Sequence, residues 1–274
     1  MKLLIAADME GISGVVNWNQ VTSTHPDYSR FRRLMTQDVN AAIEGAFRGG
    51  ATEIVIADGH AGGYNILIEE LDARVCLNSG NPAPWAMIQG IDGSFNGVMF
   101  IGYHARMGTQ GANLDHTWSS AQVANVWLND TLVGEAQLNG GVCGHYQVPV
   151  IMASGDQALA ADLEKWVPGI EMAVVKQATS RYSGQCLVPQ VAQKLISEAA
   201  ERAVRKALAG NAPQPIHFET PIQVTVEFFS SAMADGASLL PYSERVDARK
   251  VSFRAEDMLM AYRAFRSLVS LADR

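Results

Sequence analysis

Two carboxylates follow an apolar segment near the start of the sequence. The run Leu3–Ala7 has the character of a buried strand, and it is followed by Asp8 and then by Glu10 two positions later. Residues two apart on an extended chain point the same way, so both carboxylates would face one spot. Two acids that close repel each other and shift each other's pKa unless a cation neutralises them. The stretch therefore indicates a cation site.

Imidazole side chains follow two further apolar runs. Residues 53–57 lead into Asp58-Gly59-His60, and residues 97–103 lead into His104. Ligands of open α/β sheets bind outside the carboxyl ends of the strands, where these groups would meet. A third acid, Glu135, follows a predicted hairpin at 123–134.

A set of carboxylates and imidazoles is a donor set that zinc accepts readily. With Asp8 as a bridge, two ions could be held by Asp8, Glu10, His60, His104 and Glu135. Two-metal sites polarise a carbonyl and ionise water near neutral pH, which is the outline of a hydrolase.

Each of these residues also has an ordinary structural interpretation. Asp8 and Asp58 could be turn or capping residues, and His104 could be a core histidine with a satisfied hydrogen bond. Glu135 could be an exposed acid in the first turn of a helix. Their shared position at strand ends favours the metal site over these separate explanations.

The pattern of elements predicts an α/β fold, a three-layer sandwich with a mostly parallel or mixed sheet. Short apolar runs alternate with amphipathic stretches, as in βα units, and helices are expected at 29–47, 156–166 and 189–209. Residues 222–228 alternate apolar and polar side chains, and a closing amphipathic helix follows. We therefore expect an α/β metal-binding body at 1–209 and a smaller C-terminal α+β region packed on it at 210–274.

Composition restricts the class of protein. The 274 residues carry a formal net charge of −7, which argues against nucleic-acid binding. No run approaches the roughly 20 apolar residues of a membrane span, and the opening MKLLIAAD is a poor signal peptide. Cys76, Cys143 and Cys186 predict reduced thiols in a cytoplasmic protein rather than a disulfide framework. Cys143 is the cysteine whose reactivity merits a check.

Several segments resemble the zinc D-aminopeptidases of the dipeptide-operon type. The matching segments follow the family's order and spacing along nearly the whole chain: ADMEGISG at 7–14, DGH at 58–60, GYHAR at 102–106, DHTWS at 115–119, NDTLVGEAQLN at 129–139, VKQATSR at 175–181 and AEDMLMAYRAF at 255–265. The resemblance implies two Zn²⁺ ions per subunit, held by the five residues proposed above. It also implies a catalytic histidine at His116, a preference for short D-residue peptides, and a homodecamer enclosing its active sites.

Under this interpretation the protein removes the N-terminal residue of short peptides by a metal-activated water, with His116 moving the proton to the leaving amine. One alternative is a metal-dependent amidase that acts on small non-peptide amides. Another is a non-catalytic small-molecule-binding α/β protein, although neither GxGxxG nor GxxxxGK[ST] is present. We further expect Asp58 to orient His60. Three more residues could contact substrate: Asn139, Lys176 and Arg181. Two tryptophans, Trp118 and Trp127, are expected to serve packing.

Overall fold

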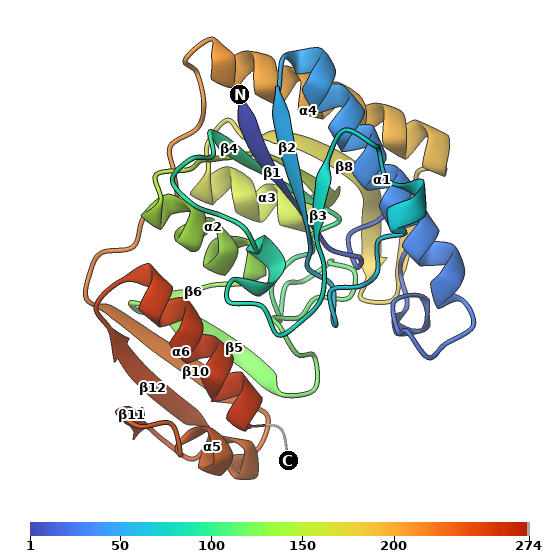
Figure 1. Ribbon diagram of the computed structural model, residues 1–274. Coiled ribbons are helices and arrows are strands. Elements are labelled where there is room, and N and C mark those ends of the chain that lie inside the picture. The colour runs from blue at the N-terminus through green and yellow to red at the C-terminus, as the bar shows by residue number, and fades with distance from the viewer. Residues whose placement is uncertain (273–274) are drawn as a thin grey trace.

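A seven-stranded sheet forms the centre of the body. The computed structural model describes residues 1–272, and Figure 1 shows this sheet between the helices of the upper half. Its strand order is β3-β2-β1-β4-β7-β8-β9. The bounds are β1 (Lys2–Ala7), β2 (Glu53–Asp58), β3 (Cys76–Asn78), β4 (Gly97–Ile101), β7 (Val150–Asp156), β8 (Glu171–Ser180) and β9 (Ser183–Cys186). The pairs from β3 to β8 are parallel and β9 is antiparallel, so the predicted mostly parallel sheet is confirmed.

Helices cover both faces of this sheet. Leu3 and Ile5 of β1 pack in one core with α1 (Tyr28–Gly49) and α4 (Pro189–Leu208). Leu4 and Ala6 point to the other core, which includes α2 (Glu135–His145) and α3 (Gln157–Trp166). Because β1 is buried on both faces, its sequence is an uninterrupted apolar run rather than an alternating one. The three-layer arrangement predicted for the body is confirmed.

The two helices on the first face approach each other closely at a glycine. A Cβ atom added to Gly45 of α1 would lie 2.0 Å from the carbonyl oxygen of Ser197 in α4. Only hydrogen fits at this point, which sets the separation of the two helices. α1 ends at Gly49, and Gly50, whose φ is 110°, forms a left-handed C-cap after it.

A second, antiparallel sheet lies below the body in Figure 1. Its order is β11-β12-β10-β5-β6, with bounds β5 (Val123–Leu128), β6 (Thr131–Leu132), β10 (Ile222–Phe228), β11 (Ser243–Arg245) and β12 (Lys250–Ala255). α6 (Met258–Leu271) packs on β10 and β12 and also contacts α2, while α5 (Ser231–Ala237) packs beside α6. Three short 3-10 helices complete the chain: η1 (Trp18–Gln20), η2 (Ile68–Glu70) and η3 (Ala86–Ile88).

The second sheet is not confined to residues 210–274. β5 pairs with β10, for example Val224 with Leu128, so the hairpin expected in the body supplies two strands to the other sheet. The reason is that β10 has two strand edges, and the hairpin covers the edge that β12 leaves open. A division at residue 209 therefore does not coincide with the boundary between the sheets. No helix within residues 1–272 combines the length and the apolar character needed to cross a membrane.

Candidate metal centre

The loops after β1 and β4 meet at the carboxyl edge of the large sheet. Gly11 donates its backbone N–H to the carbonyl of Gly102 over 2.7 Å. A Cβ on Gly11 would lie 1.9 Å from the carbonyl oxygen of Tyr103, so the contact requires glycine. This close approach brings the residues that end β1 beside His104.

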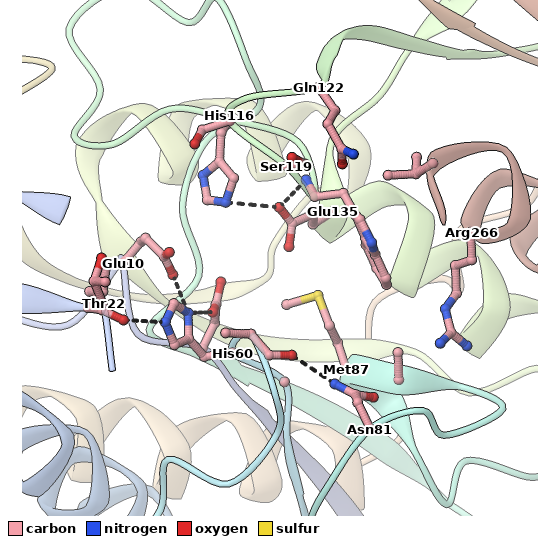
Figure 2. A pocket seen from close by; sticks show the side chains of 18 of the residues that line it. Glu10, Thr22, His60, Asn81, Met87, His116, Ser119, Gln122, Glu135 and Arg266 are labelled. Carbon is pink, nitrogen blue, oxygen red and sulfur yellow. Dashed lines mark hydrogen bonds and ion pairs between the residues drawn. The ribbon is translucent and has the colours of Figure 1, made fainter. Parts of the chain in front are cut away.

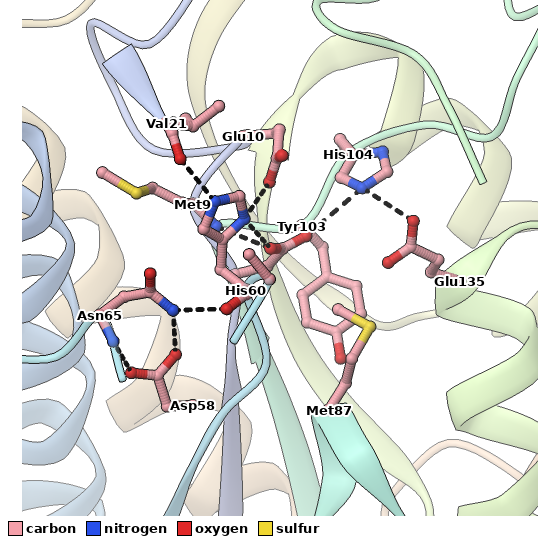
Figure 3. A network of polar contacts seen from close by, with 12 residues as sticks. Met9, Glu10, Val21, Asp58, His60, Asn65, Met87, Tyr103, His104 and Glu135 are labelled. Atoms are coloured by element: carbon pink, nitrogen blue, oxygen red, sulfur yellow. Dashed lines mark hydrogen bonds and ion pairs between the residues drawn. The ribbon is translucent and has the colours of Figure 1, made fainter. Parts of the chain in front are cut away.

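Asp8 lies between the imidazoles of His60 and His104, both labelled in Figure 3, and presents a different oxygen to each. Its Oδ1 is 3.3 Å from Nδ1 of His60, and its Oδ2 is 3.3 Å from Nε2 of His104. Glu10 completes the first pair, because its Oε2 is 3.0 Å from the same Nδ1 of His60. Glu135 completes the second pair, because its Oε1 is 3.3 Å from Nε2 of His104. The five predicted ligands are therefore together, and all are buried.

The histidines of the centre share one hydrogen-bonding arrangement. His60 donates from Nε2 to the carbonyl of Val21 over 2.9 Å, and His104 donates from Nδ1 to the carbonyl of Ala105 over 3.0 Å. His116 donates from Nδ1 to the carbonyl of Leu114 over 2.8 Å. A carbonyl can only accept, so the other ring nitrogen of each histidine is left to face the carboxylates. Ligating histidines are commonly oriented in this way.

Glu135 is the first residue of α2 and is held in place by backbone. Its Oε1 accepts the N–H of Trp118 over 2.7 Å and lies 3.6 Å from Nε2 of His116. Trp118 adopts a left-handed backbone with φ 67°, which turns its N–H toward the carboxylate. The predicted alternative, an exposed first-turn acid, is wrong, since Glu135 is buried.

Opposite charges shift the pKa values of these groups strongly. Burial opposes the charged form of Asp8, but its close contacts with the imidazoles of His104 and His60 outweigh this effect and hold its pKa well below the usual range. Burial also favours the neutral ring of His60 and of His104, yet the neighbouring carboxylates raise the pKa of both well above the ordinary value. The carboxylates thus stabilise a positive charge on the ring nitrogens that face them. A metal ion can replace the protons on these nitrogens.

The donor set fits metal ions on two further observations. Oε2 of Glu10 and Nε2 of His104 are buried without a hydrogen-bond partner within residues 1–272. Donor atoms of Asp8, Glu10 and His104 lie within 4.8 Å of one another, and so do those of His104, His116 and Glu135. Nitrogen and carboxylate oxygen donors at this spacing suit zinc.

His116 lies beside His104 and Glu135. Its ring stacks on His104 with centroids 4.0 Å apart, and the ring of Trp18 meets its edge at 5.1 Å. Burial and the charge of His104 lower the pKa of His116 below its ordinary value. Its ring is therefore neutral at pH 7, with the lone pair of Nε2 available.

A cavity of about 950 Å³ opens over the centre (Figure 2). Carboxylate and imidazole side chains form one part of its wall, and uncharged side chains together with one arginine form the rest. These other lining residues include Trp18, Thr22, Met87, Gln122 and Arg266. The volume lies at the upper end of the range for small-ligand pockets and admits a short peptide.

Lys176 does not line this cavity. It is buried, and its Nζ donates to the carbonyls of Glu10 over 2.6 Å and Val15 over 2.5 Å. Burial lowers its pKa to about 8. Lys176 thus fastens the loop that carries the first two carboxylates, and nothing in its position in the sequence distinguishes this role from substrate contact.

Asn139 and Arg181 are likewise outside the cavity wall. Asn139 is hydrogen bonded to the hydroxyls of Tyr103 and Tyr262, and Arg181 pairs with Asp115 at 3.1 Å. The expectation that these residues contact substrate is wrong for the described cavity, because each side chain is used within the protein.

The structure shows the roles of four other residues that the sequence singled out. The carboxylate of Asp58 accepts from Asn65 and Ile66 rather than from His60, whose ring is oriented by Val21 instead. The ring of Trp118 lines the cavity, whereas Trp127 packs under Lys250 as expected. Cys143 is fully buried and burial raises its pKa, so its thiol is unreactive.

Comparisons with known proteins cover the whole chain. Residues 1–267 match the Peptidase M55 family of D-aminopeptidases. A D-aminopeptidase of Bacillus subtilis (strain 168) is 36% identical over 275 residues, which cover 100% of this chain and 98% of that protein. The solved structure of the Zn-dependent D-aminopeptidase DppA from Bacillus subtilis, a self-compartmentalizing protease, matches with a TM-score of 0.94 and 36% identity. That match covers 100% of this chain and 98% of the solved one.

Both the sequence match and the structural match include all the residues of the buried cluster of carboxylates and imidazoles. On these grounds the chain belongs to the D-aminopeptidase family of peptidases.

Proposed function

We propose that this protein is a zinc aminopeptidase with two metal ions per subunit, which removes the N-terminal residue of short peptides containing D-amino acids. The single observation that carries the proposal is the position of Asp8, whose two oxygens face two different imidazoles at 3.3 Å. A carboxylate placed in this way is suited to bridge two cations.

The distances divide the donors into two groups around the bridge. Glu10 and His60 lie on the Oδ1 side of Asp8, and His104 and Glu135 lie on the Oδ2 side. Zinc at such positions supplies Lewis acidity toward a peptide carbonyl and makes water acidic enough to ionise near neutral pH. Two bound ions would neutralise the three carboxylates of this wall, so the α-amine of the peptide would approach it as a neutral nitrogen donor rather than as a cation.

His116 is proposed as the group that moves a proton. Its Nδ1 proton is held by the carbonyl of Leu114, so Nε2 accepts a proton from water and then gives it to the departing amine. Its lowered pKa keeps Nε2 unprotonated at the start of the reaction. The ring of Trp18 and the stacked ring of His104 fix its plane, which keeps Nε2 directed toward Glu135.

Metal analysis combined with a chiral dipeptide panel tests the proposal. We expect two zinc ions per chain and cleavage of D-Ala-D-Ala in preference to L-Ala-L-Ala. Cleavage of small non-peptide amides alone would identify an amidase, and a protein without stoichiometric metal would contradict any metallopeptidase function.

Two variants separate ligand from catalyst. Asp8→Ala should remove activity together with bound zinc, because it removes the bridge. His116→Ala should lower kcat by about 10²- to 10⁴-fold with zinc retained. Loss of zinc from His116→Ala would instead make this residue a ligand. The exposed His217→Ala serves as the matched control and should change neither quantity.

A homo-oligomer is part of the proposal, with the decamer as the expected form. Support comes from the self-compartmentalizing description of the Bacillus subtilis structure and from exposed apolar side chains near β11. Leu239, Tyr242 and Val246 are 64%, 94% and 54% exposed. Light scattering after size-exclusion chromatography would give the number of subunits. The cytoplasmic location stays a prediction, in keeping with three free cysteines.

A further inference from the structure

One cation lines the cavity across from its acids. Within residues 1–272, Arg266 of α6 is the only lysine or arginine in the cavity wall. Figure 2 shows it on the side of the pocket opposite Glu10 and His60, reaching down from α6. Arg266 belongs to the second sheet's covering helix, so the cavity has an acidic wall from the body and a basic group from the other region.

The guanidinium of Arg266 is fixed from one side. Its Nη1 donates to the carbonyls of Ala83 over 2.7 Å and Pro84 over 2.8 Å. The group also lies 5.7 Å from the ring centre of Trp118 and 6.0 Å from that of Tyr262. Carbonyls and aromatic faces orient a guanidinium but do not neutralise its charge.

The remaining donors of Arg266 are available. In the described part of the chain, neither Nε nor Nη2 donates a hydrogen bond, and no carboxylate forms an ion pair with the group. A planar fork with free donors, partly shielded from solvent, is matched by the two oxygens of a carboxylate.

We propose that Arg266 binds the C-terminal carboxylate of the substrate, which makes the enzyme selective for very short peptides with a free C-terminus. This inference rests on the proposed function, in which the peptide's amine lies at the acidic wall. With its amine at the metal centre, a short peptide directs its carboxylate toward the side of the cavity where Arg266 has free donors. A longer or C-terminally blocked peptide places no carboxylate at Arg266.

Substrate pairs that differ only at the C-terminus test this role. We would measure kcat/KM of the zinc-loaded enzyme for D-Ala-D-Ala and for its C-terminal amide, with wild type, Arg266→Gln and Arg266→Lys. Hydrogen bonds to charged groups predict a loss of about tenfold to a hundredfold for Arg266→Gln on the free acid, chiefly in KM. On the amide the loss should stay below about threefold, because the amide carries no charge for Arg266 to bind. Arg266→Lys should lie between, since it keeps the charge and loses the fork.

A control on the same helix separates recognition from folding. Arg263, one turn earlier, lies over the ring of Trp85, 4.6 Å from its centre, and does not line the cavity. Arg263→Gln should leave the preference for acid over amide unchanged. Equal losses of Arg266→Gln on acid and amide would overturn the inference, and so would a wild type that does not distinguish the two.

A binding measurement keeps this inference distinct from the proposed function. Calorimetry on zinc-loaded His116→Ala, with and without Arg266→Gln, reports affinity for acid and amide without turnover. If zinc-loaded wild type cleaves neither peptide, the proposed function fails. In that case tighter binding of the acid than of the amide, lost with Arg266→Gln, would still support carboxylate binding by Arg266. Equal binding of acid and amide would overturn it.

Discussion

Asp38 offers a quantitative test of the packing between α1 and α4, through the replacement Asp38→Asn. The side chain is 2% exposed, and its Oδ2 has no hydrogen-bond partner within residues 1–272. Burial raises its pKa from the ordinary 3.8 to about 8, even though Gln193 and the charge of Lys176 act in the opposite direction. Folding must therefore keep a proton on Asp38 that the unfolded chain has released.

The sign and size of the effect follow from this difference. Between about pH 4 and pH 8 the folded state binds one proton more than the unfolded state, so stability falls as the pH rises. The slope from this one group is about 1.4 kcal/mol per pH unit, with an upper limit near 6 kcal/mol above pH 8. Asparagine does not ionise, so the variant lacks this contribution.

The assay is urea unfolding of metal-free wild type and Asp38→Asn from pH 5 to pH 9. The quantity compared is the free energy of unfolding of Asp38→Asn minus that of wild type. It should rise by about 4 kcal/mol between pH 5 and pH 8 and then level off. Other titrations cancel in the difference. Asp27→Asn, at the exposed N-cap of the same helix, should give no such slope. A flat difference for Asp38→Asn would refute the reasoning.

Three further perturbations have defined outcomes. The two histidines that face Asp8 have raised pKa values, so zinc binding at pH 7 should release about two protons per chain. Calorimetry in buffers of different ionisation enthalpy measures this release, and release of no protons would contradict the assignment of the ligands. Gly45→Val should lower the free energy of unfolding by about 3 kcal/mol or more in a denaturant titration, because its Cβ would overlap a backbone oxygen of α4. Gly93→Ala, where a Cβ has open space, should change it little. Lys176→Met should weaken zinc binding by about tenfold or more, because it frees the loop that carries Asp8 and Glu10. Competition with a chelator measures this affinity, and an unchanged value would show that the loop is fixed without Lys176.

The strand ends could be predicted from sequence because burial and chemistry coincide there. Leu3–Ala7 can be apolar throughout only if both faces are covered, and Asp8 is then forced to the sheet's edge. The same reasoning places His60 and His104 at that edge, so three ligands could be brought together without coordinates. Their rotamers follow from packing with neighbours that the sequence does not identify.

Three features could not be predicted because they depend on contacts between distant residues. α2 is buried on nearly all sides and contains three glycines, so it has no apolar stripe with a helical period. The histidines are oriented by main-chain carbonyls, such as those of Val21 and Leu114, and any residue type supplies a carbonyl. Pairing of β5 with β10 joins segments almost a hundred residues apart, and strand alternation alone does not specify a partner.

The split origin of the small sheet has a consequence for dissecting the protein. A fragment that stops before β10 would retain β5 with one unsatisfied row of amides and carbonyls, inviting self-association. The complementary piece would lose both the flanking hairpin and the acidic wall that faces Arg266 across the pocket. Neither half is thus a candidate for independent expression, and limited proteolysis between them should yield a nicked, still assembled molecule rather than two separable modules.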